Sequence, residues 1–186
     1  HYPVRIRCLG VWDTVGNIGN PFFSSTPLSR RASFHDLSLH DTVDVALHAL
    51  SIDEQRGTFK PPLWTRPAEQ TPPAGQLVEQ AWFSGTHADV GGGWRETGLS
   101  DIALIWMARR ASEATGLAID WQQLAASTRP DPLGPQHDSL AGKIFRLGRL
   151  IPFIRPIGQS EKAIPRWRRS LLGTWRTGLL ARSDVT

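Results

Sequence analysis

The sequence predicts an α/β fold, in which a parallel sheet is flanked by helices and followed by an irregular, basic C-terminal tail. Three observations favour this class. Two short apolar runs, over residues 4–12 and 78–84, have the length and the flanking turn residues of buried strands. Apolar residues at helical spacing lie between these runs, and again after the second run. Strands and helices that alternate in this way build parallel sheets through right-handed crossovers.

The first half of the chain supplies one strand and one helix in this prediction. The strand over residues 4–12 is closed by turn residues at 14–21, and residues 22–37 are expected to form a surface loop. A helix is then expected from an N-cap at Asp41 to about Ser51. Its apolar residues recur at spacings of three and four, at Val43, Ala46, Leu47 and Leu50.

The second half begins with prolines that make residues 57–78 an irregular crossing loop. The strand over 78–84 is expected to continue into a loop that reaches Gly98. A helix from Ser100 or Asp101 to Gly116 is apolar on most sides, so we expect it to be buried on a sheet face. A loop over 127–139, a helix over 138–148 and a short helix near 166–176 complete the prediction.

Composition restricts the class of protein. A length of 186 residues and a hydrophobic fraction of 40% predict one domain with a real core. The single cysteine, Cys8, allows no disulfide within the chain, which favours a reducing compartment. We find no signal peptide and no apolar stretch long enough for a transmembrane helix. Because His1 stands almost directly before a strand, we expect the chain to be cut from a longer polypeptide that is cytoplasmic in the producing cell.

Charge divides the chain into two parts. Ten basic and two acidic residues lie from Lys143 to the C-terminus, a net charge of +8, which leaves −4 on residues 1–142. We therefore expect a hydrolase-like domain over 1–142 and a basic, Trp- and Arg-rich tail over 143–186 that packs on the same domain. The tail suits an anionic membrane surface or an acidic partner, or is simply a solvated basic face. It lacks a recognition module for nucleic acid.

An acid and a histidine stand at the ends of the two predicted strands. Asp13 follows the first strand, and His87 follows the second, just before Gly91, Gly92 and Gly93. This is the chain order of the last two members of an α/β-hydrolase triad. A histidine titrates near neutral pH and can take the proton of a serine hydroxyl, while a carboxylate fixes the imidazole tautomer. Both residues also have structural interpretations, as a turn cap and as a hydrogen-bonded histidine.

Four segments carry a resemblance to a known family. They are L-G-V-W-D-T-V-G at 9–16, H-A-L-S-I-D-E-Q-R at 48–56 with F-K-P at 59–61, W-F-S-G-T-H-A-D-V-G-G-G at 82–93, and L-S-D-I-A-L-I-W-M at 99–107. Together they resemble the DUF2235 family of α/β-hydrolases, which includes the Tle1-like phospholipase effectors of type VI secretion. The resemblance covers roughly residues 5–107. It implies a partial α/β-hydrolase-like sheet, a triad acid at Asp13, a triad base at His87, a lipid or ester substrate and delivery by type VI secretion.

The nucleophile that the resemblance implies is absent from the sequence. This family carries its serine in a G-x-S-x-G elbow upstream of the W-D-T-V-G segment, and no such elbow occurs here; Gly158–Lys162 lacks the last glycine. The chain is therefore expected to be the C-terminal part of a serine esterase or phospholipase whose N-terminal half supplies the serine. It is expected to be inactive alone and to need no cofactor.

The sequence also allows two other functions. A metal-dependent hydrolase would use Asp13, His87 and Asp89 as ligands, although the other histidines show no zinc spacing. For Asp89 a structural role, such as binding the loop backbone, is favoured over a metal. A non-catalytic domain would instead bind a membrane or a protein through the basic tail.

Overall fold

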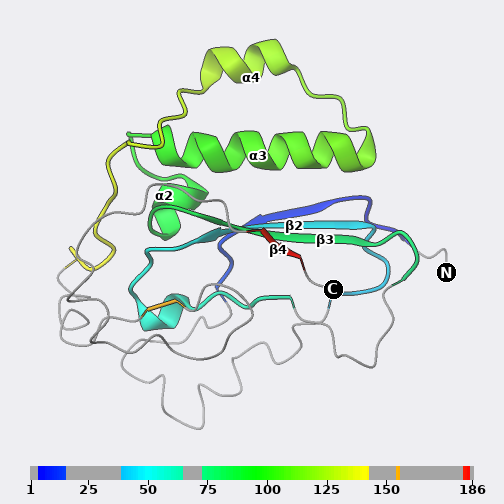
Figure 1. Ribbon diagram of the computed structural model, residues 1–186, viewed down its shortest axis with the longest axis horizontal. Coiled ribbons are helices and arrows are strands. Elements are labelled where there is room, and N and C mark those ends of the chain that lie inside the picture. Colours follow the sequence, from blue (N-terminus) through cyan, green and yellow to red (C-terminus); the bar gives the residue numbers. More distant parts are fainter. Residues whose placement is uncertain (1–3, 16–38, 65–72, 143–153, 156–181, 185–186) are drawn as a thin grey trace, which may run out of the picture.

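A four-stranded sheet with helices on one face is the main feature of the computed structural model, which describes residues 4–15, 39–64, 73–142, 154–155 and 182–184 (Figure 1). The strands lie in the order β1-β2-β3-β4, with bounds Leu9–Trp12, Val45–Ser51, Leu77–Phe83 and Arg182–Asp184. The first three are parallel, and β4 pairs with β3 in the antiparallel sense. The predicted α/β class with a parallel sheet is confirmed.

Strand β1 is shorter than predicted. Only Leu9–Trp12 of the expected run over residues 4–12 pairs continuously with β2, in the register that places Leu9 beside Ala46. Upstream of β1, Ile6 forms a single parallel bridge with Val43. The last residue of β1 stands directly before Asp13, so the strand delivers this carboxylate to one edge of the sheet.

The helix predicted from Asp41 to Ser51 is wrong, because this segment forms β2. All seven residues of Val45–Ser51 are buried, with β1 on one side and β3 on the other. A strand covered on both faces is apolar along its whole length, so its side chains show no alternation of apolar and polar residues. Short apolar runs of this kind fit both a helical and an extended spacing.

Strand β3 is confirmed, but the loop predicted after it contains a short helix. Helix α2 spans His87–Gly91. Thr86 caps it in a capping box, in which the Thr86 side chain binds the backbone of Asp89 and the Asp89 side chain binds that of Thr86. Glycines follow at Gly92 and Gly93, with φ of 83° and 137°, values that favour glycine.

Helix α3 confirms the long helix predicted after Gly98, with somewhat different bounds. It spans Gly98–Thr115, begins after Thr97 and ends at Gly116, which has the left-handed conformation expected of a C-terminal cap. It lies along one face of the sheet (Figure 1). Helix α4, Trp121–Ser127, was not predicted; it lies beyond α3 and buries none of its residues.

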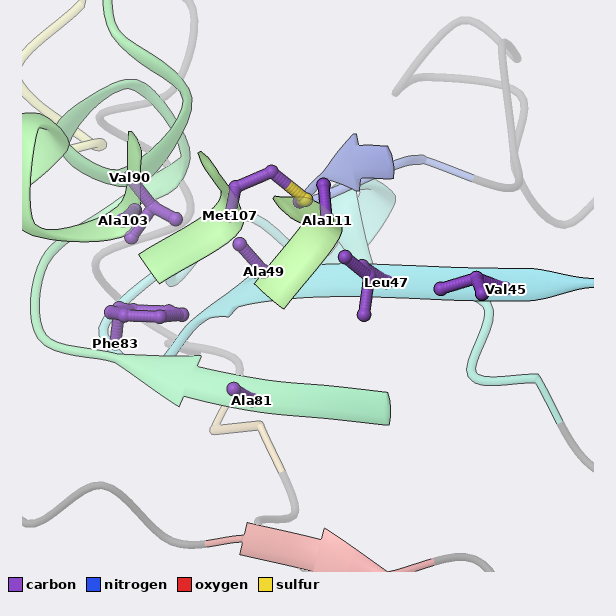
Figure 2. Packing of buried hydrophobic residues seen from close by; sticks show 9 residues of the cluster. All are labelled: Val45, Leu47, Ala49, Ala81, Phe83, Val90, Ala103, Met107 and Ala111. Atoms are coloured by element: carbon purple, nitrogen blue, oxygen red, sulfur yellow. The ribbon is translucent and has the colours of Figure 1, made fainter. Parts of the chain in front are cut away.

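The core lies between α3 and the sheet, as Figure 2 shows. Its buried side chains come from β2, β3, α2 and α3, namely Val45, Leu47, Ala49, Ala81, Phe83, Val90, Ala103, Met107 and Ala111. Alanines on both layers let the helix approach the sheet closely, and Met107 fills the space above Gly10. This layer fixes β2 and β3 against each other, and thereby fixes the strand ends that carry the polar residues described below.

The remaining predictions have mixed outcomes. The crossing loop holds one short 3-10 helix, η1 at Gly57–Phe59, and is irregular elsewhere in its described part. The loop predicted over 127–139 is confirmed from residue 128, because Ser127 is the last residue of α4. The described start of the helix predicted over 138–148 is a turn, and the rest lies outside the described residues. The loops at 16–37, the helix near 166–176 and most of the basic tail also lie outside them. In the described part of the chain, no helix has both the length and the apolar character needed to cross a membrane.

Candidate active site

Asp13 is buried at the carboxyl end of β1, where the backbone and the neighbouring strand hold it. Its φ of 38° is uncommon for a residue with a side chain, and such conformations persist where the surroundings fix them. The Asp13 N–H donates to the carbonyl of Ala49 at 2.7 Å. Ser51, which ends β2, donates its N–H to Oδ1 at 2.9 Å and its hydroxyl to Oδ2 at 3.0 Å. Two adjacent strand ends therefore orient this carboxylate.

His87 meets Asp13 across 74 residues of chain. The Nδ1 atom of His87, the first residue of α2, lies 2.8 Å from Oδ2 of Asp13. An ionised carboxylate can only accept hydrogen bonds, so Nδ1 is the donor in this contact. The side chain is 33% exposed, and Nε2 has no hydrogen-bond partner among the described residues. The imidazole is thus fixed through one nitrogen and open at the other.

A second carboxylate, that of Glu54, holds the backbone of His87. The His87 N–H donates to Oε2 of Glu54 at 3.2 Å, and Arg56 makes a two-nitrogen pair with Glu54 at 2.8 Å for each bond. Burial alone would raise the pKa of Glu54, but the hydrogen bonds from Arg56 outweigh it and lower that pKa. The Arg56 guanidinium lies 3.6 Å over the ring of Phe59, which meets the His87 ring edge-on at 5.1 Å between centroids.

A second arginine, Arg155, binds the carboxylate of Asp13 directly. Its side chain is fully buried, its Nη1 donates to Oδ1 of Asp13, and its Nη2 donates to Oδ2 at 3.0 Å. The same guanidinium donates to the carbonyl of Ser51 at 2.8 Å, to its hydroxyl at 2.7 Å, and to the carbonyl of Phe59. Asp13 therefore accepts hydrogen bonds from Ser51, His87 and Arg155 together.

These contacts keep Asp13 ionised. Burial of the carboxyl group would by itself raise the pKa of Asp13. Hydrogen bonds from His87 and Arg155, together with the charge of Arg155, outweigh burial and lower the pKa of Asp13 to about 2. A carboxylate that stays charged and accepts from Nδ1 is the arrangement that holds an imidazole ready to act as a base through Nε2.

Two buried groups predict how the stability of the chain depends on pH. His48 of β2 is buried, its Nε2 accepts from the N–H of Thr14 at 3.4 Å, and burial lowers its pKa from 6.5 to about 4. The unfolded chain then binds a proton that the folded chain excludes, so this stability is lost as the pH falls from 6.5 to about 4. The same sign holds for Asp13, whose contribution is lost between pH 3.8 and about 2. We expect losses of about 3 and about 2 kcal/mol in the two windows.

Denaturant unfolding at successive pH values checks this prediction. The His48→Gln variant should lose the dependence in the upper window and keep the lower one, because only the first titrating group is removed. A wild-type free energy of unfolding that stays level between pH 6.5 and 4 would contradict the assignment of His48 as a neutral buried group.

Asp89 lies apart from this dyad. Its Oδ2 accepts from the N–H and the hydroxyl of Thr86, each at 2.8 Å, and from the N–H of His137 at 3.1 Å. Its Oδ1 lies 2.6 Å from Nδ1 of His137, whose ring stacks on Trp94 at 4.1 Å between centroids. Asp89 therefore ties the start of α2 to the loop that follows α4. Within the described ranges, no group of three or more His, Cys, Asp or Glu side chains is placed to hold a metal.

The structure thus brings together Asp13 and His87, and leaves Asp89 out of their contacts. Sequence reasoning missed four residues that hold the dyad: Ser51, Glu54, Phe59 and Arg155. The sequence predicts Ser51 at the end of a helix, and it predicts Arg155 in a tail that faces a membrane, a partner or solvent. A signal for Arg155 was its place between apolar Ile154 and Pro156, in a segment with few acidic partners.

Comparison with known proteins gives a family match over more than half of the chain. The family described as "T6SS, Phospholipase effector Tle1-like, catalytic domain" matches residues 1–110, a range that includes both members of the dyad. No curated protein matches the chain. One similar solved structure is that of an uncharacterized protein from Pseudomonas aeruginosa, with 26% sequence identity, a TM-score of 0.47 and coverage of 69% of this chain. The chain spans only 21% of the length of that protein.

Proposed function

This chain belongs to the family of Tle1-like phospholipase effectors of type VI secretion, through their catalytic domain, and from that membership we propose that it supplies the acid and the base of a serine esterase. His87 is the base and Asp13 the acid. The observation that carries the proposal is the 2.8 Å contact between Nδ1 of His87 and Oδ2 of Asp13, made by an imidazole whose Nε2 has no partner among the described residues.

The dyad performs the proton transfers of ester cleavage in this proposal. Nε2 of His87 takes the proton of a serine hydroxyl as its oxygen attacks the ester carbonyl. The imidazolium, stabilised by Asp13, then donates that proton to the leaving alcohol as the ester bond breaks. In the second half of the cycle, Nε2 takes a proton from water, which attacks the acyl-enzyme, and returns a proton to the serine. Asp13 follows β1 directly and His87 begins α2, and both are held by several hydrogen bonds, which matters because small displacements of the base cost large factors in rate.

The serine is proposed to come from polypeptide outside these 186 residues. The sequence contains no G-x-S-x-G segment, the motif that would present a nucleophilic serine. Ser51 is the serine nearest the dyad, but its hydroxyl donates to Asp13 and it therefore cannot present itself to His87. We propose a carboxylic ester of a phospholipid as the substrate, and delivery of the complete protein by type VI secretion.

The esterase proposal and the origin of the serine are tested together with short acyl esters of p-nitrophenol. The isolated chain is expected to give no turnover above background, because its base has no hydroxyl to activate. A polypeptide that joins residues 1–186 to the natural segment encoded upstream is expected to hydrolyse the esters and to be labelled at serine by a fluorophosphonate.

Each outcome decides one part of the proposal. Robust hydrolysis by the isolated chain that depends on His87 would overturn the external serine. A joined polypeptide that folds, but neither turns over ester nor takes up the label, would overturn the esterase itself. The joined polypeptide with Ser127→Ala is the matched control, because Ser127 of α4 is exposed and its hydroxyl bonds only carbonyls of its own helix, so labelling at the upstream serine should stay intact.

A further inference from the structure

We propose that Arg155 is a positioning residue of this site, which orients the Asp13 carboxylate toward His87 by a two-nitrogen contact. This inference rests on the proposed function for its catalytic meaning. The contact itself belongs to the described geometry: both terminal nitrogens of Arg155 donate to Asp13, one to each oxygen. A planar guanidinium matched to a planar carboxylate fixes the plane of that carboxylate, which a single point charge cannot do.

Orientation matters here because only one carboxylate oxygen serves the imidazole. Oδ2 of Asp13 accepts from Nδ1 of His87, while Oδ1 accepts from the backbone of Ser51. Rotation of the carboxylate about its bond to Cβ would pull Oδ2 away from Nδ1. Arg155 opposes this rotation, because the guanidinium is itself anchored to the carbonyls of Ser51 and Phe59.

Arg155 also reaches the second member of the dyad, through Phe59. The Phe59 carbonyl accepts from Nη2 of Arg155, and the Phe59 ring packs edge-on against the imidazole of His87. One buried guanidinium therefore holds both the carboxylate and the aromatic wall on which the imidazole rests. Arg155 leaves the open Nε2 side of His87 free, because its hydrogen bonds go to Asp13, Ser51 and Phe59.

Charge balance gives a second reason for the arginine. Two carboxylates, Asp13 and Glu54, face His87, and each is paired with one arginine, Arg155 and Arg56 respectively. Among the described residues, the buried carboxylate of Asp13 would have no ion-pair partner without Arg155 except the imidazole. A buried carboxylate without a counter-ion tends to take up a proton. A protonated Asp13 would no longer act only as a hydrogen-bond acceptor for Nδ1 of His87.

The role of Arg155 can be read from the His87 ring by NMR, without any enzymatic turnover. Nitrogen-15 and proton spectra of the 186-residue chain report which ring nitrogen carries the proton and whether Nδ1–H is hydrogen-bonded. We expect wild type to show one tautomer with a strongly downfield Nδ1 proton. Arg155→Met should lose that signal and give a mixture of tautomers, and Arg155→Lys, which keeps the charge but not the fork, should weaken it.

The control is Arg110→Met. Arg110 of α3 also pairs with a carboxylate, Glu79 at 2.7 Å, but touches neither member of the dyad, so its loss should leave the His87 spectrum unchanged. A folded Arg155→Met chain with the wild-type tautomer and Nδ1 signal would overturn the proposal. Should Arg155→Met fail to fold, a folded Arg155→Lys chain with an unaltered signal would overturn it equally.

In the joined, serine-containing polypeptide, kinetics separate this inference from the proposed function. Arg155→Met should lower kcat by about 100-fold with KM nearly unchanged, as expected when a base is displaced without loss of substrate contacts. A change confined to KM would overturn the positioning role. A joined polypeptide with no activity at all would refute the esterase, while the spectra would still decide whether Arg155 orients the dyad.

Discussion

Replacement of His87 by alanine is expected to abolish ester hydrolysis by the joined, serine-containing polypeptide. The imidazole of His87 is partly exposed, whereas the other unpartnered nitrogens described near Asp13, Nδ1 of His48 and Nε of Arg155, are buried. Among the described residues no neighbour is therefore placed to take over its proton transfers. In serine hydrolases, loss of the base costs about a million-fold in kcat, leaving only the contribution of binding and of the oxyanion site. Steady-state assays with short acyl esters measure this loss, and fluorophosphonate labelling should fall in parallel.

The matched control for this substitution is His137→Ala. His137 is also a partly exposed histidine bound through Nδ1 to a buried carboxylate, that of Asp89. Its Nε2 lies 3.6 Å from Glu96 and its ring is stacked on Trp94, so the geometry gives it an anchoring role. We expect this variant to lose stability and to retain turnover when folded. Equal loss of activity in the folded His137→Ala and His87→Ala variants would mean that the wrong histidine has been placed in the dyad.

The two members of the dyad could be predicted from sequence because each combines a local signal with a strand end. Asp13 follows an apolar run and precedes turn residues, and His87 follows another and precedes three glycines. Parallel strands present their carboxyl ends at one edge, so residues in these two places meet wherever the strands share a sheet. The prediction therefore needed only that the two strands lie in one sheet and run in the same direction.

The strand between β1 and β3, β2, is the element that the sequence predicts wrongly, as a helix. Leu47, Ala49 and Leu50 of β2 are fully buried on both faces of the sheet, and such a run carries no period that separates it from a buried helix. The decision is made by tertiary contacts: β1 and β3 offer backbone partners on both sides, which a helix could not use. Local propensity has little influence on a segment that pairs with a strand on each side, here β1 and β3.

Arg155 could not be assigned because its role depends on a contact that spans 142 residues of chain. A basic residue in a tail of net charge +8 is, on composition, a surface residue. It is instead buried, because Asp13 and the carbonyls of Ser51 and Phe59 together bind both of its terminal nitrogens. Only the fold shows that a carboxylate at the sheet edge needs a cation, and which arginine supplies it.

Replacement of Asp13 by asparagine is expected to destabilise the chain by about 3 to 5 kcal/mol, because it leaves the buried charge of Arg155 without its counter-ion. The asparagine amide would also direct N–H groups toward the donors of Ser51 and Arg155. Denaturant unfolding of the 186-residue chain at neutral pH measures this loss. In the joined polypeptide, the same variant should lower kcat by about ten-thousand-fold, because His87 would be held in the wrong tautomer.

A second substitution separates the two effects of Asp13. The double variant Asp13→Asn, Arg155→Met removes the unpaired buried charge, so it should regain much of the lost stability while kcat stays low. Asp44→Asn is the control, because Asp44 pairs with the exposed Arg5 and Arg7 at the surface and should change stability little. If Asp13→Asn were as stable as wild type, Asp13 would not be the counter-ion of Arg155. If the double variant recovered kcat along with stability, the carboxylate would matter for folding alone, and His87 would need no acid to orient it.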